Sequence, residues 1–312
     1  MTKRILSCDW GTSSFRLRLV SLENNSVIAE TTGNNGIASV YNEWLQSNYA
    51  EKYRMDFYKT LLQSEVKKLT AGSLDEVPMI ISGMASSSIG IKELPYVELP
   101  LPVNGDSLHF IKIPPDEKCN HEILLVSGLR TTNDAMRGEE TMLVGCNIRD
   151  DAEQLIIFPG THSKHAVVKN KVLLDFSSYM TGEVFELLAN KSILSKSIIK
   201  DESNLYNDIF KQGVKEGASG NLLNVIFHVR TRRLHRTITP EENYHYLSGL
   251  LIGCELKQIP EVTVKIQLVC GQELLDLYQL ALETLSNTGN IQYTDAGTAL
   301  IDGHCKLSRH FL

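Results

Sequence analysis

The stretch ILSCDWGTSSFRLRLVSL, residues 5–22, decides the fold, because a related stretch, LIIFPGTHSKHAVV, follows at residues 155–168. Each reads as an apolar strand, a small turn that contains Gly-Thr, and a second strand. Glycine lets a backbone approach an anion closely, and the exposed N–H groups and hydroxyls around it bind phosphate oxygens. Two such hairpins predict two half-domains that hold one polyphosphate between them, which indicates nucleotide binding.

Length and charge bound the class of protein. A chain of 312 residues exceeds one comfortable core, so we expect two domains. The net charge of −6 argues against a nucleic-acid partner, which would require a basic face. The basic stretch HVRTRRLHR at 228–236 is an exception, and a solvated helix end is its simpler interpretation.

Cysteine usage and hydropathy indicate a cytoplasmic protein with no membrane partner. The six cysteines form no CxxC pair or other metal-binding spacing, as is typical of free thiols in a reducing compartment. The N-terminal apolar stretch is too short for a signal peptide. No apolar run approaches the roughly 20 residues that a membrane-spanning helix needs.

The predicted elements occur in a similar order in the two halves of the chain. The first half is expected to contain strands at 5–9, 15–21, 27–32, 79–82 and 123–127, with helices at 51–69 and 136–146. The second half is expected to contain strands at 155–158, 166–169, 172–176 and 264–270, helical sequence up to about 257, and helices at 271–285 and 295–306. The proline-containing segment 84–121 is expected to be a long functional loop. The order indicates an α/β protein with two related domains, a boundary at 149–153 and a cleft between the domains.

The first turn offers one acid and several hydroxyls. Asp9 ends the first predicted strand, where its carboxylate can hold Mg²⁺ through water, since this ion prefers oxygen ligands together with substrate phosphates. An Asx turn is the alternative interpretation of Asp9, and the repeated hairpin favours function. Gly11, Thr12 and Ser13 are candidate phosphate-binding residues.

The second turn offers Gly160, Thr161 and Lys164. The lysine ammonium can serve as a point charge for a phosphate, although a surface lysine on a strand is an equally good interpretation. Two histidines nearby lack the companions of a metal site. Gly271, between a predicted strand and a helix, is a place where a flat ligand can lie on the backbone, or it only permits a tight turn.

Asp134 is a candidate general base. It lies in a polar stretch, 132–141, where we expect it just before a helix. In phosphoryl transfer to an alcohol a carboxylate accepts the hydroxyl proton, and a helix N-cap is the compatible structural interpretation. Arg137, Glu139 and Glu140 either meet substrate or pair with one another.

These residues belong to motifs that resemble the sugar-kinase branch of the actin, hexokinase and Hsp70 superfamily. The resemblance is closer to the 2-dehydro-3-deoxygalactonokinase family. The matching pieces occur in family order over nearly the whole chain: DWGTSS at 9–14, SGM at 82–84 with Gly90 and PY at 95–96, DAMRGEET at 134–141, PGTHSK at 159–164, MTGE at 180–183, VRTRRL at 229–234 and LSGLLIG at 247–253.

The resemblance implies an activity and an architecture. The activity is ATP-dependent, Mg²⁺-assisted phosphorylation of 2-dehydro-3-deoxy-D-galactonate at its 6-hydroxyl, a step of D-galactonate catabolism. The architecture is two ribonuclease H-like, actin-type ATPase domains at 1–150 and 151–295, with the last helix, about 296–312, joining the first domain. The domains would close on ATP and sugar acid, and a homo-oligomer is left open.

The resemblance also assigns roles by position. Asp9, Gly11 and Thr12 fall on the first phosphate motif; Gly160 and Thr161 fall on the second. Gly271 falls on the adenosine-side motif, and Asp134 falls where related sugar kinases keep a base.

The substrate carboxylate needs a cation, for which arginine's planar fork is well suited. Arg137 and Arg230 are the first candidates and Arg18 the next, with Ser86 and Glu139 as further substrate-binding candidates.

The chain departs from the family pattern at three places. Residues 85–88 read ASSS where relatives favour Gly-Ser, which bears on the choice of sugar acid. His165 stands where relatives favour tryptophan. Gln272 and Glu273 follow the adenosine-side glycine in place of small residues, which bears on the preference for adenine.

Three alternatives compete with this interpretation. The chain is a kinase for another sugar or sugar acid, or a hydrolase like the superfamily's exopolyphosphatases, although a long polyanion would favour a positive channel. The third is a regulatory ATP switch. Such members often add a DNA-binding module, for which we expect no room before a first strand that begins within five residues of Met1.

Overall fold

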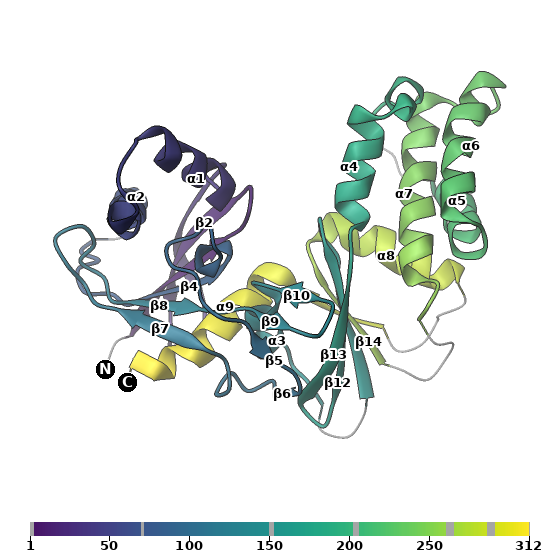
Figure 1. Cartoon of the computed structure of the whole chain (residues 1–312). Helices are drawn as coiled ribbons and strands as arrows, with labels where there is room; N and C mark the ends of the chain where they lie inside the picture. Colours follow the sequence, from purple (N-terminus) through teal and green to yellow (C-terminus); the bar gives the residue numbers. More distant parts are fainter. Residues whose placement is uncertain are drawn as a thin grey trace. The chain divides into compact units, whose positions relative to one another are not determined.

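The structure is a computed structural model that describes residues 3–69, 72–149, 153–201, 206–259, 265–285 and 291–311 (Figure 1). Its contacts divide the chain into two compact units. The first comprises Met1–Asp150, Lys169–Asp175 and Ala296–Leu312, and the second comprises Asp151–Val168 and Phe176–Asp295. Helices pack on a β-sheet in each unit, which confirms the predicted α/β class.

The first unit is built on a sheet with the strand order β3-β2-β1-β4-β8-β7. Its strands are β1 (Arg4–Trp10), β2 (Phe15–Ser21), β3 (Val27–Gly33), β4 (Met79–Gly83), β7 (Phe110–Ile113) and β8 (Ile123–Val126). The first three form an antiparallel meander, β4 and β8 continue it parallel to β1, and β7 is an antiparallel edge.

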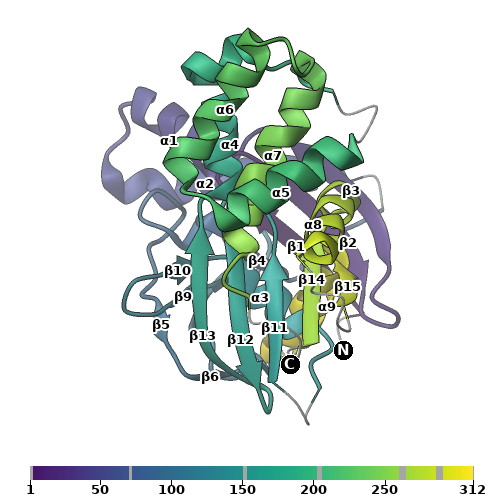
Figure 2. The same cartoon turned by 90° about the vertical axis from the view of Figure 1, so that its right-hand side faces the viewer.

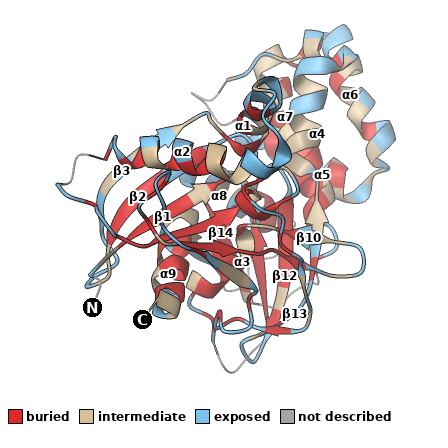
Figure 3. Ribbon diagram, turned by 60° about the vertical axis from the view of Figure 1, so that its left-hand side comes forward, coloured by how far each residue is buried: buried red, intermediate tan, exposed pale blue. Residues whose placement is uncertain are grey.

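The two faces of this sheet carry different residues because side chains alternate along a strand. Leu6, Cys8 and Trp10 of β1 are buried in one core with α1 (Ile37–Gln46) and α2 (Arg54–Val66) (Figure 3). Ser7 points the other way, toward His304 of α9 (Ala296–Leu307). Asp9, two residues further along β1, shares the face of Ser7, and α9 packs there against α3 (Glu139–Gly145).

The second unit repeats this strand order. Its sheet runs β15-β14-β11-β12-β13, which matches β8-β4-β1-β2-β3 of the first unit element by element. The strands are β11 (Glu153–Phe158), β12 (Ser163–Lys169), β13 (Val172–Tyr179), β14 (Lys265–Cys270) and β15 (Ile291–Asp295). Figure 2 shows β13, β12, β11 and β14 side by side. The shared order confirms the prediction that the two halves are related.

The described residues of the second unit include five helices, three of which share a core with its sheet, while the other two pack in a separate core of helices. The five are α4 (Thr181–Lys191), α5 (Asn207–Ser219), α6 (Leu222–Leu234), α7 (Pro240–Leu256) and α8 (Gln272–Thr284). The longest, α7, begins at a capping box formed by Thr239 and Glu242. Among the described residues, no helix combines the length and apolar character needed to cross a bilayer.

Helices α5 and α7 touch backbone to backbone through glycines spaced four residues apart. A Cβ built at Gly213 or Gly217 of α5 would lie 2.3 or 2.0 Å from a carbonyl oxygen of α7. A Cβ at Gly249 or Gly253 of α7 would lie 2.2 Å from a carbonyl oxygen of α5 in either case. Real Cβ atoms do not approach so closely, so the spacing of the two helices depends on these glycines.

Some predicted elements differ from the structure. The segment 84–121, expected to be a loop, carries β5 (Val97–Glu98), β6 (Leu101–Pro102) and β7. The helix expected from 136 begins at Glu139, because Ala135–Met136 instead pairs as β10 with β9 (Leu129–Arg130). Helix α1 and strand β15 were not predicted. The expected boundary at 149–153 and the expected strand start at 264 fall partly or wholly outside the described residues.

The α5–α7 contact predicts that replacing one of its glycines by alanine destabilises the protein, although this change normally stabilises a helix. Alanine normally stabilises a helix interior by about 1 kcal/mol relative to glycine. Gly217→Ala should instead lower the free energy of unfolding by about 2 kcal/mol, because the new methyl group forces the helices apart. Urea unfolding checks this, with Lys215→Ala on the exposed side of α5 as the control. A stabilised Gly217→Ala would contradict the packing described here.

A second prediction concerns acid. Burial, and then the charge of Arg18, lower the pKa of His304 to about 3, and its ring lies 2.7 Å from the Ser7 hydroxyl and 3.1 Å from that of Ser82. Unfolding therefore takes up a proton between about pH 6.5 and pH 3, so stability falls as pH falls through this window. Between pH 6.5 and 5 the loss should be about 2 kcal/mol. In urea unfolding at both pH values, His304→Asn should lose less than the wild type; equal losses would refute the assignment.

Candidate active site

The first turn, Gly11 to Ser14, lies against the start of a helix. The Gly11 N–H closes the turn on the Ser14 carbonyl at 2.9 Å. The first N–H groups of α1, from Ile37 and Ala38, donate to the carbonyls of Gly11 and Thr12 at 2.9 and 3.1 Å. The side chains of Thr12 and Ser13 are exposed. The turn therefore presents exposed hydroxyls beside a helix N-terminus, where the dipole favours an anion.

The second turn repeats this geometry. The N–H of Glu183, in the first turn of α4, donates to the Thr161 carbonyl at 3.0 Å, and Thr161 is exposed. A Cβ at Gly182 would lie 2.7 Å from the Gly160 carbonyl oxygen. Likewise a Cβ at Gly36, the residue before α1, would lie 2.4 Å from the Thr12 carbonyl oxygen. In both units a glycine at the start of the helix allows the helix backbone to contact the turn.

Two carboxylates approach each other in the first unit. Asp9 pairs across the sheet with Ser82 of β4, and Glu139 begins α3. The pKa of Asp9 is raised, mainly by burial and also by the charge of the nearby Glu139, although the charges of Arg16 and Arg18 oppose the rise. No cluster of three or more metal-binding side chains occurs in the described part of the chain. A cation here would therefore complete its shell with water or substrate oxygens.

Glu140 has a structural role. Burial, and then the charge of Glu139, raise its pKa to about 8. Its carboxyl accepts hydrogen bonds from the Gly138 N–H at 2.6 Å and from the Thr141 hydroxyl at 2.9 Å. Gly138 has φ of 105° and passes close to Gly83 at the end of β4. Glu140 thus holds the bend that sets the position of Glu139.

Asp134 lies in the turn between β9 and β10. The Thr131 hydroxyl accepts from the N–H groups of Asn133 and Asp134 at 3.2 and 3.0 Å, which fixes the turn. The expectation that Asp134 directly precedes a helix is wrong, because β10 intervenes and Gly138 occupies the N-cap. The cap interpretation of Asp134 is therefore removed.

Arg137 and Ser86, both substrate-binding candidates, are in contact. Arg137 Nη1 donates to the Ser86 carbonyl at 2.7 Å and to its hydroxyl at 2.6 Å, and Nη2 donates to the Leu94 carbonyl at 3.1 Å. The guanidinium also stacks on Tyr96, 4.0 Å from the ring centre. Arg137 thereby ties the 86–96 segment to the hairpin that carries Asp134.

The other candidate cations have different surroundings. Arg18 is buried and pairs with Glu30. Arg230 lies on α6 in the second unit, with Nη1 3.3 Å from the Ser197 hydroxyl. Lys164 is buried, and its ammonium donates to the His162 carbonyl at 2.7 Å. The structure thus brings Arg137 to Ser86 in the first unit, whereas Arg230 and Lys164 belong to the second.

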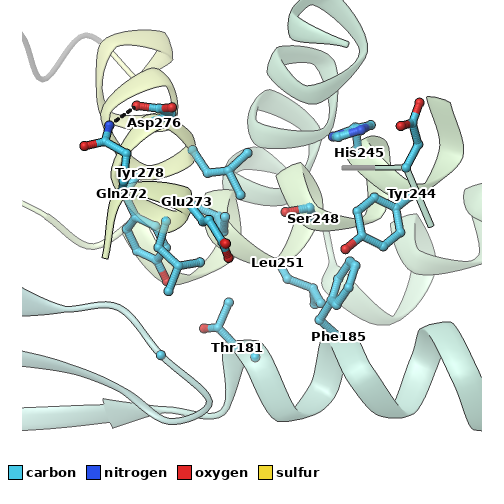
Figure 4. A pocket seen from close by; sticks show the side chains of 16 residues that line it. Thr181, Phe185, Tyr244, His245, Ser248, Leu251, Gln272, Glu273, Asp276 and Tyr278 are labelled. Carbon is cyan, nitrogen blue, oxygen red and sulfur yellow. Dashed lines mark hydrogen bonds between the residues drawn. The ribbon is translucent and has the colours of Figure 1, made fainter. Parts of the chain in front are cut away.

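A pocket of about 500 Å³ opens in the second unit beside the second turn (Figure 4). It is lined by residues of the turn, of α4, α7 and α8, and of the segment between α4 and α5: Gly160, Thr181, Gly182, Phe185, Asp201, Tyr244, His245, Ser248, Leu251, Ile252, Gln272, Glu273, Leu274, Asp276, Leu277 and Tyr278. Phe185 and Tyr244 meet edge to face at 5.1 Å. A Cβ at Gly160 or at Gly271, which precedes α8, would meet nothing within 4 Å. The backbone at these glycines is therefore open to a ligand.

Most of the residues that line this pocket were not predicted from the sequence. These residues come from helices far apart in the chain, so no local pattern joins them. A signal was present in MTGE and LSGLLIG, which supply Thr181, Gly182, Ser248 and Leu251, but neither motif suggested a pocket.

Comparison with known proteins gives the family. Residues 9–307 match the sequence profile of the 2-keto-3-deoxy-galactonokinase family. The chain is 30% identical, over 95% of its length and 93% of the relative's, to a 2-dehydro-3-deoxygalactonokinase of Rhizobium meliloti (strain 1021). It is 27% identical to that of Escherichia coli (strain K12), over 91% of each chain. A crystal structure of a 2-dehydro-3-deoxygalactonokinase protein from Sinorhizobium meliloti superposes with a TM-score of 0.81 at 27% identity, over 98% of this chain and 96% of the other. The chain therefore belongs to the 2-keto-3-deoxy-galactonokinase family and is a sugar-acid kinase.

Proposed function

We propose that this chain transfers the γ-phosphoryl group of Mg·ATP to the 6-hydroxyl of 2-dehydro-3-deoxy-D-galactonate, giving 2-dehydro-3-deoxy-6-phosphogalactonate and ADP in D-galactonate catabolism. The observation that carries the proposal is the pocket beside the second turn, in a chain of this family. The substrate is the one in the names of the relatives from R. meliloti and E. coli.

The pocket suits a nucleotide. Phe185, Tyr244 and Leu251 offer apolar surface for a base, and the open backbone at Gly160 and Gly271 leaves room for ribose and phosphates. The hydroxyl and N–H groups of Thr161 and of Thr12 and Ser13 suit phosphate oxygens, since each turn adjoins a helix N-terminus.

Asp9 suits a magnesium ion held through water. It supplies carboxylate oxygens at the carboxyl end of β1, and Glu139 adds negative charge nearby. Magnesium, when bound, neutralises charge on the transferred phosphoryl group. Burial and the charge of Glu139 raise the pKa of Asp9 despite the charges of Arg16 and Arg18, and a bound cation would favour its ionised form.

Asp134 is proposed as the general base that accepts the proton of the 6-hydroxyl. Its turn is held by Thr131 on one side and by the anchored Arg137 on the other, so its backbone is well placed for a fixed role. Arg137, Ser86, Glu139 and Arg230 remain proposed contacts of the sugar acid.

A coupled ADP-release assay with Mg·ATP tests the function. The acceptors are 2-dehydro-3-deoxy-D-galactonate, its D-gluconate epimer, D-galactonate, and a blank without sugar. We expect turnover with the 2-dehydro-3-deoxy acids and none in the blank. Equal ADP release in the blank would favour a hydrolase, and activity only with D-galactonate would move the assignment to another acceptor.

Asp134→Asn tests the base. Loss of a positioned base typically costs about 10²-fold or more, so kcat should fall by that factor. The dissociation constant of ATP, measured by calorimetry, should not change. Glu98→Gln is the matched control, because Glu98 lies in the same small sheet and pairs with Arg130. Full activity of Asp134→Asn would remove Asp134 from the mechanism.

A further inference from the structure

A buried carboxylate lies behind the second turn. The side chain of Glu255, near the end of α7, is 1% exposed. It accepts hydrogen bonds from the Tyr278 hydroxyl at 2.7 Å, from His165 Nε2 at 2.9 Å and from the Thr181 hydroxyl. Three donors on one buried carboxylate are well suited to offset the cost of removing its charge from water.

The three donors come from elements that build the pocket and the turn. Thr181 and Tyr278 line the pocket, from α4 and α8. His165 lies on β12, two residues after Ser163. The Tyr278 hydroxyl lies 3.0 Å from the Ser163 hydroxyl, to which the Gly160 N–H donates at 3.4 Å. A continuous hydrogen-bond path therefore runs from Glu255 to the backbone of the glycine turn.

Each hydrogen bond of this path has a fixed donor and a fixed acceptor. Burial, and then the charge of Glu255, raise the pKa of Tyr278 well above its ordinary value, so its hydroxyl stays protonated and donates to the carboxylate. The same hydroxyl oxygen then accepts from Ser163, which orients the serine oxygen to accept from Gly160. Replacing the carboxylate would remove the acceptor on which this order depends.

We propose that Glu255 is a positioning residue for the nucleotide: it fixes the second turn and the start of α4 in the arrangement that receives the phosphates. The proposal rests on the proposed ATP-dependent function. Glu255 lies behind Thr181 and Tyr278, so it acts through these two pocket residues and the turn. Its loss should therefore affect nucleotide affinity more than sugar-acid affinity.

Glu255→Gln is the first test. The amide keeps the shape but turns one acceptor oxygen into a donor that faces other donors. Loss of an orienting partner behind a metal-binding side chain typically costs about 10-fold or more in affinity, and we expect the same order here. We expect the ADP dissociation constant and the KM for ATP to rise by about that factor, with the KM for the sugar acid unchanged. Tyr278→Phe removes one hydrogen-bond donor and keeps the ring. It should raise the ADP dissociation constant and the KM for ATP by about 3-fold.

Glu216 provides a matched control in the same unit. This carboxylate on α5 also accepts from a tyrosine hydroxyl, that of Tyr246, and contacts His228 and Arg232, but it does not line the pocket. Glu216→Gln should lower thermal stability while leaving the ADP dissociation constant unchanged.

The outcomes separate this inference from the function on which it rests. ADP and ATP binding to the wild type is measured first by calorimetry, and absence of binding would reject the proposed function itself. If the wild type binds and Glu255→Gln binds equally well, Glu255 is not a positioning residue. An equal loss in Glu216→Gln would assign the effect to general destabilisation and overturn the proposal. Should Glu255→Gln fail to fold, wild-type affinity in Tyr278→Phe would overturn it.

Discussion

In each unit the arrangement of the candidate site depends on one contact, the close approach of the start of a helix to a glycine-containing turn. In one unit Gly36 brings α1 onto the Gly11–Ser14 turn, and in the other Gly182 brings α4 onto the Gly160 turn. The contact satisfies N–H groups that every helix leaves unpaired at its start. It also directs the helix dipole and the exposed hydroxyls to one place. Any side chain at the glycine would separate the helix from the turn, and so separate the helix dipole from the exposed hydroxyls.

Much of the fold could be predicted because its signals are local. The alternation in Phe15–Ser21 identified β2 residue for residue, and the Gly-Thr turns located both hairpins. The helix expected from Met136 begins at Glu139 instead, because Ala135–Met136 pairs with a strand that lies earlier in the chain. Pairings of two residues, such as β5 with β9, have no periodicity to read, and so the segment 84–121 looked like a loop.

The site was harder to predict, because its contacts join distant positions. The substrate-binding candidates included Arg137 and Ser86, but only the fold shows that they bind each other across 51 residues of chain. His165 looked like a departure from the family pattern, and its partner Glu255 lies 90 residues away. The residue types suggested that these side chains form polar contacts. The partner of each side chain is set by the packing of the fold, and so it cannot be read from a short stretch of sequence.

The glycine contacts between α5 and α7 have a consequence for how this protein can vary. Every coded alternative to glycine carries at least a Cβ, so Gly213, Gly217, Gly249 and Gly253 admit no harmless missense change while the two backbones stay in contact. A single substitution would have to be compensated by a shift of a whole helix, and α7 also carries Tyr244, Ser248 and Leu251 into the pocket. The position of α7, and with it the position of these pocket residues, therefore depends on the four glycines.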